Sequence, residues 1–83
     1  MCKAREIVKE RIEKLCQERG LSRYGLSHQT GVPLSTLMHM MEGEIDNPGI
    51  MTIVKICNGI EISLAEFFDT PEFEKLVAEA NKE

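Results

Sequence analysis

The chain has 83 residues, of which 42% are hydrophobic and 29% are charged, and its net charge at pH 7 is −4. This length suits one domain, and the composition is that of a folded globular protein, which argues against a disordered chain. No apolar run is long enough to span a membrane, and the first residues, MCKAREIVKERIEK, lack the apolar segment of a signal peptide, so we expect neither.

The three cysteines predict neither a disulfide framework nor a metal site. Cys2, Cys16 and Cys57 are odd in number and show no C-x-x-C spacing. Cys16 and Cys57 lie in helical apolar patterns, where a free thiol behaves as a small hydrophobic group. Unpaired cysteines favour a reducing compartment, so we expect a cytoplasmic protein without a metal or another cofactor.

The first half of the chain predicts three helices. Apolar residues recur at helical spacing over residues 3–19, and Gly20 ends this helix. Ser22 is a good N-cap for a short helix over residues 23–29. A glycine and a proline then break the chain before a third helix over residues 34–42.

The second half predicts three more helices. Pro48 starts a fourth helix with a wide apolar face, and Asn58-Gly59 ends it. Ser63 to Glu66 form a capping box that opens a short fifth helix. Thr70-Pro71 begins a last helix, and no segment alternates with period two as a strand would. The last helix carries an apolar stripe of Phe73, Leu76 and Val77.

The central motif is SRYGLSHQTGVPLSTLMHMMEG over residues 22–43. Two short helices joined by a tight, glycine-containing turn are the pattern of a helix-turn-helix. Gly31 can adopt the positive φ that this turn needs, and the small Ser27 lets the two helices approach closely. Leu37 and Met40 are spaced to anchor the second helix of the motif to the core.

From Val8 to Phe68 the sequence resembles the Cro/Xre-type, phage-repressor-like helix-turn-helix family. The resemblance implies an all-α, five-helix repressor-like domain over residues 1–69, with residues 70–83 as an extra helical tail. It also implies sequence-specific binding of double-stranded DNA by a transcriptional regulator. The matching segments are ERGLS at 18–22, Leu26, TGVP at 30–33, Ser35-Thr36-Leu37, Gly43, Asn47-Pro48 and ISLAEFF at 62–68.

In this family the third helix enters the major groove, and the starts of the second and fourth helices approach phosphates. Here the implied reading positions are exposed ones on the helix 34–42, and among them only Ser35, Thr36 and His39 can hydrogen-bond to bases. Glu44 stands where a basic residue is common, so we expect modest affinity. The resemblance implies base reading by Leu34, Ser35, Thr36, Met38 and His39, and phosphate binding by Ser22, Arg23, Asn47 and Gly49.

Two further positions depart from the family together. Members commonly carry an arginine at the position of Cys16 and a glutamate at that of Met41, paired in the interior. Both residues are apolar here, as a stable core requires when an ion pair is lost. We expect Cys16 and Met41 to be buried in mutual contact. We expect Cys16→Arg alone to cost about 3–5 kcal/mol of stability.

Charge leaves a second function class open. Residues 1–20 hold six basic and four acidic residues, whereas residues 44–83 hold three basic and nine acidic ones. The acidic balance and the apolar reading helix suit a protein-interaction or oligomerisation module that kept the fold without strong DNA binding. We also consider a homodimer formed through the last helix. We expect no enzymatic activity and no small-molecule substrate, because no nucleophile–base pair or phosphate-binding loop is present.

Overall fold

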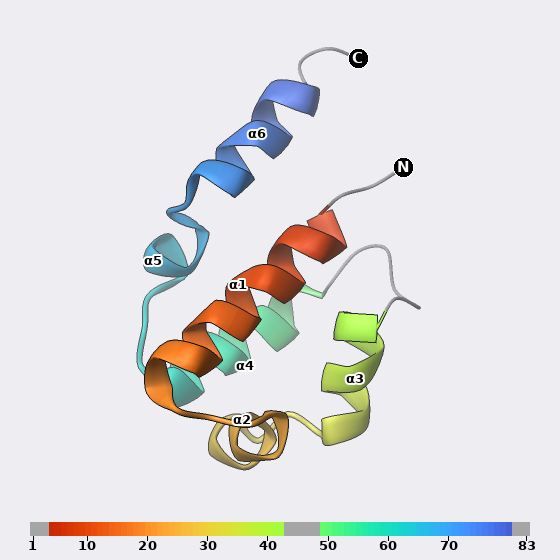
Figure 1. Ribbon diagram of the computed structural model, residues 1–83, viewed down its shortest axis with the longest axis vertical. Coiled ribbons are helices and arrows are strands. Elements are labelled where there is room, and N and C mark those ends of the chain that lie inside the picture. The colour runs from red at the N-terminus through yellow and green to blue at the C-terminus, as the bar shows by residue number, and fades with distance from the viewer. Residues whose placement is uncertain (1–3, 43–48, 81–83) are drawn as a thin grey trace.

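The computed structural model describes residues 4–42 and 49–80, and these residues form six helices and no strand. Helices α2 and α3 lie at one end of the molecule and α6 at the other (Figure 1). The all-α class expected from the sequence is therefore confirmed. No helix in the described ranges has the length and hydrophobicity needed to cross a membrane. The helices are α1 (Ala4–Arg19), α2 (Arg23–Thr30), α3 (Leu34–Glu42), α4 (Ile50–Ile60), α5 (Leu64–Phe68) and α6 (Pro71–Ala80).

One apolar core joins the first five helices. Leu37 and Met40 of α3 are fully or almost fully buried in it, which confirms their predicted anchoring role. No polar or charged side chain of the described residues is buried, so the core rests on apolar packing. The core consists of Val8, Ile12, Leu15, Leu26, Val32, Leu37, Met40, Met41, Ile53, Ile56, Cys57, Ile60 and Phe67.

The helix caps follow the sequence expectations closely. The Ser22 hydroxyl accepts a hydrogen bond from Gly25 N at 3.0 Å, and the Ser63 hydroxyl accepts one from Glu66 N at 3.0 Å. Gly20 adopts a φ of 66° at the end of α1. The boundary signals at Gly43 and Pro48 lie outside the described residues.

The predicted end of the fourth helix at Asn58-Gly59 is wrong. Helix α4 continues to Ile60, and Glu61 adopts the left-handed conformation with a φ of 61°. Gly59 has a different role, because a Cβ placed there would lie 2.6 Å from the Thr30 Cα of α2. The glycine therefore lets α2 and α4 pack with their backbones close together, and Gln29 Nε2 donates to Gly59 O across the contact at 3.1 Å.

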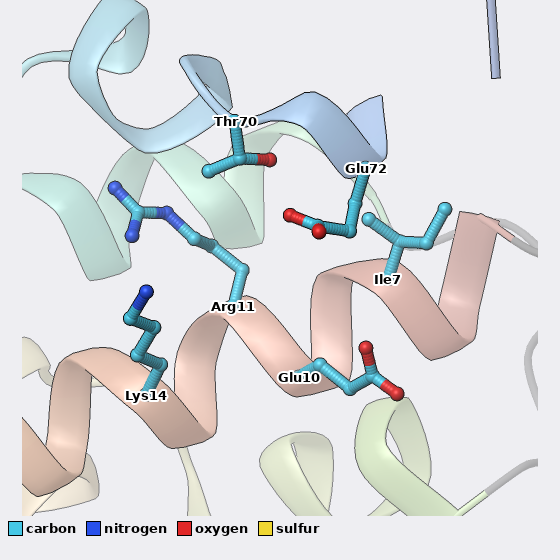
Figure 2. A pocket seen from close by; sticks show the side chains of 6 residues that line it. All are labelled: Ile7, Glu10, Arg11, Lys14, Thr70 and Glu72. Carbon is cyan, nitrogen blue, oxygen red and sulfur yellow. The ribbon is translucent and has the colours of Figure 1, made fainter. Parts of the chain in front are cut away.

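Arg11 joins α1 to the C-terminal helices. Its Nε donates to Phe67 O at 2.7 Å and its Nη2 to Glu66 O at 2.8 Å, so it satisfies carbonyls at the end of α5. Arg11 and Thr70 line a hollow of about 210 Å³. Figure 2 shows the Arg11 side chain reaching from α1 toward the segment that carries Thr70. Phe73 of α6 packs edge-on against Phe68, with ring centroids 4.8 Å apart. The start of α6 is thus held to the domain by aromatic contacts.

Candidate nucleic-acid interface

The turn between α2 and α3 is held by side-chain hydrogen bonds. The Ser27 hydroxyl donates to Val32 O at 2.6 Å. The Thr30 hydroxyl donates to Leu26 O at 2.7 Å and accepts from Val32 N at 3.3 Å. Gly31 takes the expected positive φ, at 76°. The small size of Ser27 lets the two helices approach, as the sequence predicts, and its hydroxyl also secures the turn that sets the direction of α3.

Helix α3 presents one side to the core and another to solvent. Ser35 and His39 are exposed. Leu34, Thr36 and Met38 are half-buried, so the expectation that these three are exposed is wrong. They flank the buried stripe that anchors α3, and that position removes part of their surface from solvent. Among these five candidate positions, the exposed polar side chains are therefore those of Ser35 and His39.

The candidate phosphate residues differ in exposure and in the groups that they can present to a phosphate. Ser22 and Gly49 are exposed N-cap residues of α2 and α4. Free N–H groups at a helix start attract anions. The hydroxyl of Ser22 already caps its own helix. Asn47 lies outside the described residues.

Arg23 lies beside two carboxylates, an arrangement that its place at a helix start does not predict. Its Nη1 donates to Glu42 Oε1 at 2.9 Å, and its Nη2 lies 3.9 Å from Glu13 Oε2. Nη1 also contacts Met38 Sδ at 3.4 Å. The guanidinium therefore links α2 to α1 and α3, with two carboxylates beside it. A signal was present in the sequence, since Arg23 and Glu42 are the only Arg, Lys, Asp or Glu residues between positions 21 and 43.

The expected interior pair is only half confirmed. Met41 is buried, with 2% of its surface exposed, but Cys16 is half-buried, so the expectation of a buried Cys16 is wrong. Both residues line a hollow of about 240 Å³, which Arg23 also borders. Cys16 retains exposure because it opens onto this hollow and is not enclosed by the core.

The thiol of Cys16 is not set up for reactivity. Burial and the Glu13 carboxylate raise the pKa of Cys16, while Arg23 partly opposes them. The thiol is therefore protonated at neutral pH, which is the unreactive form. Within residues 4–42 and 49–80, no group of three His, Cys, Asp or Glu side chains is arranged to hold a metal ion.

Comparisons with known proteins agree with this architecture. The chain matches the Cro/C1-type HTH DNA-binding domain over residues 11–72, a range that contains α2 to α5 and reaches the first turn of α6. It is also similar to the crystal structure of the prophage Lp1 protein 11, with a TM-score of 0.79 and 33% sequence identity, over 88% of this chain and 96% of that chain. No protein of curated function matches it significantly.

Proposed function

Because the chain belongs to the Cro/C1-type helix-turn-helix family of DNA-binding domains, we propose that it is a repressor-like transcriptional regulator that recognises specific sequences with α3. The observation that carries this proposal is the exposure of Ser35 and His39 on a helix whose opposite side is anchored in the core. The major groove of B-DNA is wide enough to admit an α-helix, and base edges there differ in their donors and acceptors. DNA binding itself follows from the family.

The proposed contacts divide into two kinds. Ser35, Thr36 and His39 hydrogen-bond to base edges, while Leu34 and Met38 contact thymine methyl groups. The helix starts position the domain on the phosphate backbone, which carries no sequence information. The proposed phosphate residues are Ser22, Arg23, Asn47 and Gly49.

We predict that His39→Ala changes the preferred DNA sequence. Loss of one base contact should reduce discrimination at one base pair by about tenfold, within the usual 1–3 kcal/mol of a good side-chain–base contact. Selection from random duplexes, followed by competition binding against the wild-type site, measures this change.

For the wild-type protein, the slope of log K against log salt should be shallow, because few cations face the DNA. Each phosphate neutralised contributes about −0.9 to this slope.

His28→Ala is the matched control, because His28 is an exposed histidine of α2 outside the proposed contacts. It should leave the preference unchanged. If His39→Ala also leaves the preference unchanged, α3 does not read bases through this residue. If the wild-type protein binds no duplex better than a neutral control protein does, the protein-interaction alternative becomes the better account.

We also propose that the protein is a dimer formed through α6, since paired half-sites about 34 Å apart need two copies. Phe73 packs within its own chain, but Val77 is 57% exposed and Leu76 is half-buried. We predict that sedimentation at micromolar concentration gives twice the chain mass of 9.4 kDa, and that Val77→Glu returns the protein to a monomer. Ala78→Glu adds the same charge at a neighbouring exposed position and should preserve the dimer. A wild-type monomer would refute this proposal.

A further inference from the structure

We infer that Glu42 limits the DNA affinity of this domain by holding Arg23 in an ion pair that DNA phosphate must displace. The inference rests on the proposed role of α3 as the groove-facing helix. It concerns the strength and salt dependence of binding, whereas the proposed function concerns which surface reads the sequence.

Arg23 lies beside the proposed reading surface. It is the first residue of α2, directly after the N-cap Ser22, and its Nη1 contacts Met38 Sδ on α3 at 3.4 Å. Residues 21–43 contain no other lysine or arginine. Arg23 is therefore the one permanent cation that the helix-turn-helix segment can offer to a phosphate.

The ion pair that occupies Arg23 is exposed enough to open. The side chains of Arg23 and Glu42 are 36% and 55% exposed, with a 2.9 Å contact between Nη1 and Oε1. Exposed ion pairs of this kind contribute little to stability, because water and salt screen them. A phosphate can replace the carboxylate and accept two parallel hydrogen bonds from the guanidinium.

Glu42 is also poorly placed to stabilise its own helix. It is the last described residue of α3, where a carboxylate opposes the negative end of the helix dipole. Glu13 adds a second carboxylate, 3.9 Å from Arg23 Nη2. With both acids in place, Arg23 brings almost no net positive charge to the DNA. If a phosphate replaces Glu42 as the partner of Arg23, the Glu42 carboxylate is left unpaired near that anion. This lowers the net free energy that binding to DNA gains from the contact.

The test is Glu42→Gln, which removes the charge and keeps the side-chain shape. We expect the affinity for duplex DNA to rise about fivefold at about 0.1 M salt. The slope of log K against log salt should become steeper by up to about 0.9, because the Glu42 carboxylate no longer offsets the charge that Arg23 brings to its phosphate. Thermal unfolding of each variant verifies that the fold is unchanged.

Two controls separate this effect from the change in net charge. Glu74→Gln makes the same charge change on an exposed residue of α6, at the opposite end of the molecule from α2 and α3 (Figure 1), and should leave affinity and slope unchanged. Adding Arg23→Gln to Glu42→Gln should abolish the gain, because the released cation is gone.

The outcomes distinguish this inference from the proposed function. Equal gains in Glu42→Gln and Glu74→Gln, or a gain that survives the loss of Arg23, would overturn the inference and leave groove reading intact. Unchanged or weaker binding by Glu42→Gln would overturn it as well. If neither the wild-type protein nor any variant binds duplex DNA, the proposed function fails and this inference fails with it.

Discussion

Met41→Glu is expected to lower the free energy of unfolding by about 3–5 kcal/mol, the usual cost of burying a charge without a partner. Met41 is 2% exposed in the core. The nearby guanidinium of Arg23 is already bonded to Glu42, and Glu13 lies beside it. A new carboxylate at position 41 would therefore lie near two carboxylates as well as the guanidinium, and it would not gain a free cationic partner. Urea unfolding followed by circular dichroism measures the loss.

Substitution at position 16, the expected partner of position 41, should have a smaller effect on stability. Cys16→Arg should cost less than the value expected from the sequence, because Cys16 is half-buried and borders a hollow through which a long side chain can reach water. Combining Cys16→Arg with Met41→Glu should recover much of the stability lost by Met41→Glu alone, since the two side chains can then pair across the hollow.

Met41→Leu is the control for size, and it should cost less than about 1.5 kcal/mol because it nearly conserves the buried volume. A double variant no more stable than Met41→Glu would show that positions 16 and 41 cannot pair. In that case the hollow between positions 16 and 41 could not accommodate the ion pair that is common in the family.

Gly59→Ala is expected to destabilise the protein by about 3 kcal/mol, at the upper end of the usual cost of overpacking. Replacing glycine by alanine inside a helix normally stabilises it by about 0.5–1 kcal/mol. At position 59 the added Cβ would lie 2.6 Å from both Thr30 Cα and Thr30 Cγ2, so α2 and α4 would have to move apart. Urea unfolding of the variant measures the change in stability.

Gly25→Ala provides the matched comparison within α2. Its Cβ would lie 3.3 Å from Leu21 Cδ2, a side-chain atom that can adjust, and we expect stability within about 1 kcal/mol of the wild type. A neutral or stabilising effect of Gly59→Ala would contradict the close approach of the two helices. Similar losses in both variants would indicate an effect that does not depend on the Thr30 contact, and the close approach at Gly59 would lose its support.

Local signals predicted much of the fold correctly. The hydroxyls of Ser22 and Ser63 cap the helices that they precede, because the N-cap bond lies within one turn of sequence. Gly31 takes its positive φ for an equally local reason, since the turn is built from adjacent residues. Family resemblance added the proposal that α3 faces the major groove, and the match over residues 11–72 confirms the family.

The candidate site was less predictable, because its charges come from separate helices. The position of Arg23 at a helix start predicts a phosphate contact. Its bonds to Glu42 and its proximity to Glu13 depend on how α1, α2 and α3 pack together. Arg11 likewise bonds to carbonyls more than fifty residues away, at Phe67 and Glu66. No periodicity or spacing in the sequence predicts the partners of Arg11, and the only signal for the Arg23 partner is that Glu42 is the one acidic residue between positions 21 and 43.

The sequence by itself determined the helix-turn-helix, its caps and its anchoring residues, because hydrophobic spacing and capping act over a few neighbouring residues. The tertiary structure alone decided that Gly59 is a contact point and not a helix end, that Cys16 faces a hollow, and that Arg23 is paired. Each of these depends on the distance between helices that are remote in sequence. That distance is set by the packing of the whole core, which no local pattern encodes.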